Sequence, residues 1–448
     1  MPTVDQIVQT TVTRTSVNAT LPGFGTPVVL AQFAGGTKGF GATQRTATYT
    51  STAAMLTAGW LATDSVYLWA SSVFAQSPRV KKIMVGRIDS GDASVAASGD
   101  AIRAESDDWY AFEVVGNRSI VFTLSTALIT GNSIASTING TTVATTVFAT
   151  DHATTMNTWK TNIQAAISGA TATVSGNTMT VTFVGKDLNA GTCAITLGAS
   201  QPTVAITFPL DATKSKAWMA WTEQQKKMVF FQDSDPAQYA ANTGNSGTAT
   251  LGEYAMLTNY QRTVVCYHGA SLASEYLVAA YLGDQLPYDP GKSDWAFKTL
   301  TGISTETLTT TQDDLIRAKN VNVYVLIAGI ASTYAGTVAK TGQFIDDQRF
   351  IDWMDTQIKL DYMNLRASNL KIPRDKVGYQ MVEGTLKATG AKGVTAGGIV
   401  DGTYTVTMPL PSAASPSDIA TRTISGIVVN YTLSGSVNNI AVAVNVAG

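Results

Sequence analysis

The chain has 448 residues, of which 45% are hydrophobic and only 14% are charged. The 30 Lys and Arg residues nearly balance the 32 Asp and Glu residues, and a net charge of −2 offers no basic field for phosphates, which excludes nucleic-acid binding as the primary role. The length allows two or three domains, and a surface poor in charge favours association between copies, although a monomer with a Thr-rich surface would have the same composition.

The first residues, 1–20, predict an N-terminal arm. Val8 and Val12 lie on one face of a strand-like segment that has no hairpin partner next to it. Because an isolated strand is not stable, we expect this arm to pair with a distant segment. The segment has neither a basic start nor an apolar run, and the longest apolar run, VNVYVLIAGIAS, is too short to cross a bilayer. We therefore expect no signal peptide and no membrane insertion, and a protein made and soluble in a cytoplasm.

Alternating strand and helix patterns predict an α/β core over residues 21–116 and 210–424. A buried strand at 26–33, a glycine-rich loop at 34–45, a largely helical segment at 51–78 and a strand at 81–88 form its first part. The alternation resumes after residue 210, with helices expected at 216–228, 250–261 and 271–285 and strands at 229–233 and 262–269. This order is typical of a mixed, mainly parallel sheet with helices on its faces.

Residues 117–209 interrupt this pattern with a segment rich in Thr, Ala, Gly and Ser. Asn139-Gly140 is a strong hairpin signal, and a second hairpin is expected to place Met179, Val181 and Phe183 on one face. Between them, Asp151 is expected to cap one helix whose apolar face is Met156, Trp159, Ile163 and Ile167. The segment therefore predicts a β-rich outer domain inserted into a loop of the core.

The C-terminal part of the core, residues 325–424, contains the strongest helix pattern, at 346–366. A strand at 403–410 leads to a closing hairpin over residues 425–448. Its first strand places Ile427, Val429, Tyr431 and Leu433 on one face, and after a turn at 434–436 its second strand does the same with Ile440, Val442, Val444 and Val446.

Residues that could carry chemistry are few, and we expect no enzyme, no cofactor and no metal. His268 has Cys266 and Ser271 close in sequence, but no nucleophile-elbow motif surrounds Ser271. Cys193 and Cys266 have no metal-type spacing. Three acidic pairs adjoin helix-like segments: Asp107-Asp108, Asp313-Asp314 and Asp346-Asp347. Because the helix dipole stabilises carboxylates at such places, we interpret the pairs as helix-end residues rather than as metal ligands. The loop GGTKGFG lacks the spacing of a phosphate-binding loop and is expected to be flexible.

Four cations lie within eleven residues of a chain otherwise sparing with charge: Arg366, Lys371, Arg374 and Lys376. They form either a solvated turn or an electrostatic dock for an acidic partner surface.

Several segments resemble contractile phage tail sheath proteins, in particular a branch that often carries only the label of an uncharacterised phage protein. The segment from STAAMLTAGW to FAQSPRVKKIMVGRI is similar to the helix-to-strand part of that family. DDWYAFEVV and AWMAWTEQQKKMVFFQDSD resemble the segment that follows, and the two pieces can be adjacent in that branch, which agrees with an insertion here. GQFIDDQRFIDWMDTQIKLDYMNLR resembles the long helix of the sheath C-terminal domain.

This resemblance implies a structural subunit that polymerises as hexameric rings around a tail tube and contracts to drive the tube through the host envelope. The implied partners are other copies of the chain, the tail tube protein, and the baseplate and tail terminator or neck proteins, in a phage virion assembled in the host cytoplasm. Terminal arms would add strands to the sheets of neighbouring subunits, through Val8, Val12, Ile440, Val442, Val444 and Val446. The cations at 366–376 would face the tube, and glycine-rich linkers such as 390–398 would act as hinges.

Other interpretations stay open at this point. The closing hairpin could be an ordinary intramolecular one. The chain could also be an α/β hydrolase that uses Ser271 or Cys266 with His268, or a surface adhesin whose binding module is 117–209.

Overall fold

The computed structural model describes residues 23–116, 119–138, 141–167, 170–183, 194–197, 202–207, 210–269 and 275–438. Contacts between residues divide the chain into two compact units. The α/β unit holds described residues 23–352 and 434–438, and the C-terminal unit holds Trp353–Leu433. The boundary between them falls inside one long helix.

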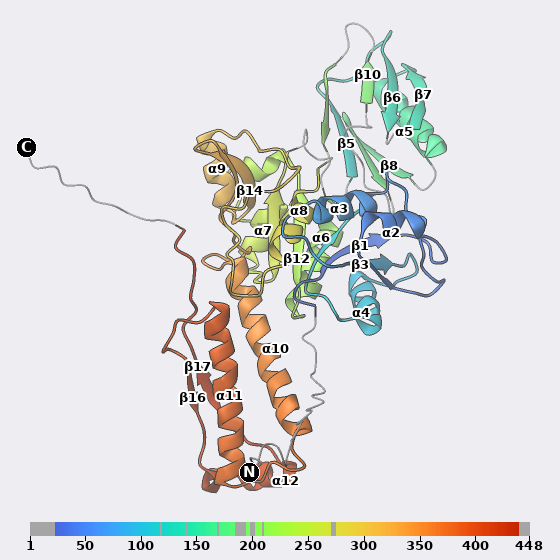
Figure 1. Cartoon of the computed structure of the whole chain (residues 1–448). Coiled ribbons are helices and arrows are strands. Elements are labelled where there is room, and N and C mark those ends of the chain that lie inside the picture. Colours follow the sequence, from blue (N-terminus) through green and yellow to red (C-terminus); the bar gives the residue numbers. More distant parts are fainter. Residues whose placement is uncertain are drawn as a thin grey trace, which may run out of the picture. The chain divides into compact units, whose positions relative to one another are not determined.

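An eight-stranded sheet forms the centre of the α/β unit (Figure 1). Its order is β15-β14-β13-β12-β4-β1-β3-β2, with six parallel strands in the middle and one antiparallel strand at each edge. The parallel strands are β1 (Pro27–Gln32), β3 (Ile83–Ile88), β4 (Ala111–Val114), β12 (Met228–Asp233), β13 (Thr263–Tyr267) and β14 (Asn322–Ile327), and the edges are β2 (Thr46–Tyr49) and β15 (Ile330–Tyr334). The inner strands are buried on both faces, which is why their sequences are apolar runs rather than alternating patterns.

Helices cover both faces of this sheet and make two hydrophobic cores. One core contains Val29 and Ala31 of β1 with side chains of α2 (Thr52–Thr57), α3 (Ser65–Phe74) and α8 (Leu277–Gln285). The other contains Val28 and Leu30 with side chains of α4 (Val95–Glu105), α6 (Ala212–Glu223), α7 (Leu251–Leu257) and α9 (Thr310–Arg317). Alternate residues of one strand thus point into different cores, as the pleat requires.

The predicted fold class, a mixed sheet with helices on its faces, is confirmed. The predicted strands at 26–33, 81–88, 229–233 and 262–269 are β1, β3, β12 and β13. The helical segment at 51–78 is two helices rather than one, and the chain between them contains Gly59 with a φ of 95°. The strands β2 and β4 were not predicted from the sequence.

The described part of the insertion forms two antiparallel sheets and one helix with a core of its own. The sheets have the orders β10-β6-β7 and β11-β5-β9-β8. Their strands are β5 (Ser119–Leu124), β6 (Ser133–Ile138), β7 (Thr141–Val147), β8 (Ala170–Ser175), β9 (Thr178–Phe183), β10 (Ala194–Leu197) and β11 (Val204–Thr207). Helix α5 (His152–Ala166) begins after its predicted cap, Asp151, and buries Met156, Trp159 and Ile163. The Asn139-Gly140 turn lies outside the described residues, and the boundaries 117–209 stay a prediction.

The C-terminal unit is built around a helix pair. Helix α10 (Ile345–Ala367) continues into this unit from the α/β unit, and α11 (Lys376–Ala396) lies against its C-terminal part. Thr389 donates a hydrogen bond to Asp361 at 2.7 Å, and Lys392 pairs with the same carboxylate at 2.6 Å. Two short strands, β16 (Thr405–Thr407) and β17 (Val428–Asn430), a 3₁₀ turn (Pro411–Ala413) and α12 (Pro416–Thr421) complete the unit.

The predicted hinge at 390–398 is wrong, because residues up to Ala396 belong to α11. The glycines serve close packing instead. A Cβ on Gly390 would lie 2.2 Å from the Tyr404 ring, and one on Gly393 would lie 2.5 Å from the Ile399 side chain. Gly397 ends the helix in the left-handed conformation, with a φ of 87°.

Candidate assembly surface and candidate sites of chemistry

The residues predicted to exchange strands lie at the two ends of the chain. Val8, Val12, Ile440, Val442, Val444 and Val446 fall outside the described residues, so their pairing stays a prediction. The first strand of the expected hairpin is described, as β17, and it pairs antiparallel with β16. Leu433 continues this pairing through a bridge to Ile399. Residues 428–433 therefore pair within their own chain.

The sheet of β16 and β17 is attached to α11 by Tyr404. The phenol O–H donates a hydrogen bond to the Leu386 carbonyl at 2.9 Å, and the ring stacks on Tyr431 with 6.1 Å between ring centroids. The missing side chain of Gly390 makes room for this ring. No third strand borders this sheet among the residues that the structure describes. Within the described residues, neither outer edge of this sheet has a neighbouring strand, and a two-stranded sheet by itself is only marginally stable.

The C-terminal unit exposes many large apolar side chains for its size. Leu370 and Leu410 are the extremes, with at least 70% of their surface exposed. The others are Tyr362, Met363, Val377, Val400, Ile419 and Val428. Scattered apolar residues are normal on a surface, whereas a contiguous exposed apolar patch marks a surface that binds another protein, so these eight residues are the candidates for such a surface in this unit. These residues were not predicted as a partner surface; Tyr362, Met363 and Val377 lie in the long helices α10 and α11, and the others lie in short elements and connections.

The four predicted docking cations gather at one end of the α10–α11 pair. Arg366 is in the last turn of α10, Lys371 and Arg374 are in the connection, and Lys376 opens α11. Three are exposed, whereas Arg374 is half-buried and donates a hydrogen bond to the Asp418 carbonyl oxygen at 2.8 Å. Three of the four are therefore available to a partner, and Arg374 supports the fold of its own unit.

The candidate catalytic group around His268 is not assembled among the described residues. His268 is fully buried, with Nδ1 3.1 Å from Glu306 and Nε2 3.5 Å from Glu275. Cys266 lies in the core, and burial raises the pKa of its thiol, which keeps it protonated and unreactive. Ser271 lies outside the described residues. The imidazole therefore faces two carboxylates rather than a nucleophile.

The other candidate groups have structural partners. Asp346 and Asp347 open α10 and Asp313 opens α9, as predicted, but Asp107 and Asp108 follow the C-terminus of α4, so the helix dipole does not explain that pair. Asp107 binds Arg103 and Lys227 instead. In the glycine-rich loop, Lys38 pairs with Asp64 and lies over the Trp60 ring, so this loop is held by its neighbours.

Among the described residues, no group of three or more His, Cys, Asp or Glu side chains could hold a metal ion. No helix in the same residues has the length and apolar character needed to cross a membrane.

No protein-family model and no curated protein sequence matches this chain. Solved structures match it over its whole length. A chain of the 6-fold symmetrised anti-feeding prophage baseplate has a TM-score of 0.53 at 10% identity, covering 100% of this chain and 99% of that chain. The contracted helical sheath of the anti-feeding prophage gives 0.51 at 10% identity, with the same coverage. The contracted PVC sheath complex of an extracellular contractile injection system gives 0.52 at 9% identity, covering 98% and 96%. The chain therefore has the fold of contractile sheath proteins, which confirms, for the fold, the resemblance that its sequence motifs indicated.

Proposed function

We propose that this chain is the structural subunit of a contractile tail sheath. It polymerises as hexameric rings around the tail tube of a bacteriophage and contracts to drive the tube through the host envelope. The observation that carries this proposal is the C-terminal unit, whose described residues include exposed apolar side chains and a two-stranded sheet that no third strand borders. The whole-chain likeness to contracted sheaths is consistent with it.

Strand exchange would complete the open sheet. The arms at residues 1–20 and 437–448 of neighbouring copies would pair with β16 or β17 through backbone hydrogen bonds, and their alternating valines and isoleucine would set the register. Burying four of the exposed apolar side chains would contribute about 6–12 kcal/mol, at roughly 1.5–3 kcal/mol each. That is the size needed to offset an association cost of about 4–15 kcal/mol.

The exposed cations Arg366, Lys371 and Lys376 would face the tail tube, where they would guide docking on an acidic surface. The remaining partners would be the baseplate and the tail terminator or neck proteins, and the site of action would be the virion. Extracellular injection systems use the same fold, so the phage assignment rests on the sequence resemblance.

A non-enzymatic role agrees with the chemistry of the buried groups. The hydrolase interpretation gains no support, because Cys266 is a core thiol and the two His268 ring nitrogens lie 3.1 Å from Glu306 and 3.5 Å from Glu275.

Electron microscopy of the purified chain at high concentration tests the proposal. Tubes or stacked rings are expected from the full chain, and soluble subunits that do not polymerise from a variant lacking residues 437–448. Tubes that form equally well from the truncated chain would contradict arm exchange, and a full chain that never forms rings or tubes would contradict the sheath role.

The docking surface has its own test with matched controls. Arg366→Glu with Lys371→Glu should weaken co-sedimentation with the tube protein at least tenfold. Lys359→Glu with Lys387→Glu makes the same charge change at exposed lysines within α10 and α11, outside the cluster, and should have little effect. Equal weakening by both pairs would show that the cluster has no special role.

A further inference from the structure

The central sheet has a topological switch point that the proposed function does not use. From β1 the chain passes to β3 on one side, and from β3 it crosses back to β4 on the other side of β1. In a sheet of parallel strands, connections that leave in opposite directions open a crevice beyond the carboxyl ends of those strands. Small ligands of α/β proteins bind in such crevices.

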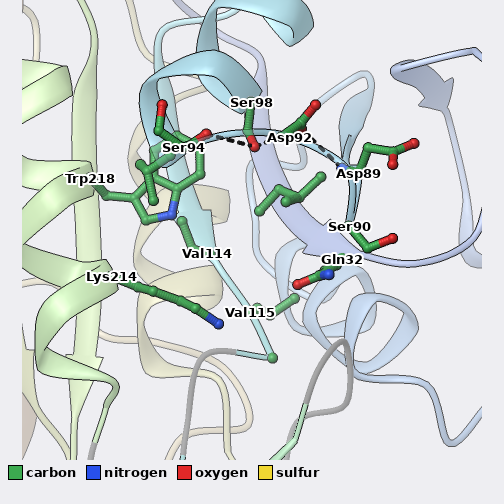
Figure 2. Close-up of a pocket in the computed structure, with 13 residues that line it drawn as sticks. Gln32, Asp89, Ser90, Asp92, Ser94, Ser98, Val114, Val115, Lys214 and Trp218 are labelled. Carbon is green, nitrogen blue, oxygen red and sulfur yellow. Dashed lines mark hydrogen bonds between the residues drawn. The ribbon is translucent and has the colours of Figure 1, made fainter. Parts of the chain in front are cut away.

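A pocket of about 230 Å³ lies at this place (Figure 2). The last residues of the three strands line it, namely Gln32 of β1, Ile88 of β3 and Val114 of β4. The start of α4 and the first turns of α6 complete it, the latter with Lys214 and Trp218. At about 30 Å³ per water, this volume holds about seven waters or a molecule of about ten non-hydrogen atoms.

Two donors of α6 line this pocket without forming a hydrogen bond within the described part of the chain. The Trp218 side chain is only 2% exposed, and its indole N–H, which Figure 2 shows on the side of Val114 and Lys214, has no acceptor there. The nearest carboxylate to the Lys214 ammonium is Asp211, at 3.9 Å, which is beyond hydrogen-bond distance. A donor at a pocket wall that has no protein acceptor can bond to water or to a ligand, so these donors fit a ligand that supplies acceptors. Gln32 adds a half-buried amide from β1.

The charges around the pocket favour an anion. Asp92 accepts two hydrogen bonds from Arg45, which lower its pKa to about 2, and it also accepts one from Ser98. Asp89 pairs with Arg87. Both aspartates thus have cationic partners, and Lys214, which has Asp211 at 3.9 Å, is the one Lys or Arg among the residues that line the pocket. The first-turn amides of α4, which no intrahelical carbonyl can satisfy, add positive potential at Val95.

We propose that this pocket binds a small hydroxylated organic anion of the phosphorylated-polyol type. Its anionic group accepts hydrogen bonds from Lys214 and Trp218, and a hydroxyl group pairs with the Gln32 amide. The pocket lies where the insertion joins the core, since Gly116 and Lys214 flank residues 117–209 and both line it. The proposal does not depend on the sheath role.

Calorimetric titration of the full chain with glycerol 3-phosphate at constant ionic strength tests this site. The wild type should bind, and both Lys214→Met and Trp218→Phe should weaken binding at least tenfold, because each removes a donor to a charged group. Lys214→Met is the decisive variant, since its side chain is half exposed and its loss leaves the core unchanged.

Lys216→Met is the matched control. Lys216 is two residues further along α6, and its ammonium lies over the Tyr254 ring rather than in the pocket. Binding that persists in this variant and is lost with Lys214→Met supports the site. No heat of binding from the wild type at 10 mM ligand, on the order of the weakest useful affinities, would overturn the proposal, and so would equal binding by all variants. Glycerol titrated alone should not bind, and binding as tight as that of the phosphate ester would show that the anionic group is not recognised.

Discussion

Gly390→Ala should open the small sheet of the C-terminal unit. In the structure, a Cβ at this position would lie 2.2, 2.3 and 2.5 Å from three atoms of the Tyr404 ring. The ring has little freedom to move away, because its O–H group is bonded to Leu386 and its face is stacked on Tyr431. One methyl group is therefore expected to push Tyr404, and with it β16, off α11.

The expected cost follows from three contributions. Overpacking costs about 1–3 kcal/mol, and the lost Tyr404 hydrogen bond costs about 0.5–1.5 kcal/mol. Replacing a helical glycine by alanine returns about 1 kcal/mol. The C-terminal unit should therefore lose about 0.5–3.5 kcal/mol of stability.

Gly384→Ala is the matched control, because Gly384 is in the same helix and an added Cβ there would meet no atom within 4 Å. It should stabilise the unit by up to about 1 kcal/mol. Hydrogen exchange of residues 403–433 reports the local stability, and electron microscopy reports tube formation. Faster exchange and fewer tubes are expected only for Gly390→Ala. If the amide hydrogens of residues 403–433 exchange equally slowly in both variants and both form tubes equally well, the role assigned to the contact between Gly390 and Tyr404 is refuted.

Three further predictions concern the α/β unit and the insertion. Asp352→Ala should cost about 3–5 kcal/mol in denaturant unfolding, because it leaves Arg262 charged and unpaired in a mostly buried place; a loss below about 1 kcal/mol would contradict this. Burial, with Asp347 and Asp294 nearby, raises the pKa of Asp346 to about 7 in the folded chain. As the pH rises, the carboxyl group therefore ionises at a lower pH in the unfolded chain than in the folded one. The free energy of unfolding should fall between about pH 4 and 7 and level off above pH 7. Asp346→Asn should flatten this slope, and parallel curves for both proteins would count against the assignment. Trp159→Ala should cost about 3–5 kcal/mol and speed proteolysis within 119–207 while leaving the central sheet protected, whereas loss of protection everywhere would argue against an independent core in the insertion.

Local patterns were sufficient to predict most elements of the α/β core. The apolar runs of β1 and β13 and the apolar spacing and end charges of α10 appear directly in the sequence, because burial on two faces and helical periodicity leave their signature in consecutive residues. The cap of α5 by Asp151 was predicted for the same reason, since a capping side chain acts within three residues. The sheath resemblance came from such segments in order.

Contacts between distant residues decided the rest. β4 is short and was not assigned as a strand, yet it pairs with β1 and β12 at the centre of the sheet. Gly390 and Gly393 predicted a hinge because glycine is flexible in isolation, but both lie in a helix where Tyr404 and Ile399 need the space. β17 pairs with β16, more than twenty residues earlier in the chain, and the donors Lys214 and Trp218 meet Gln32 only when α6 packs on the sheet. Pairing and close approach depend on geometry between segments, and no single stretch of sequence carries that information.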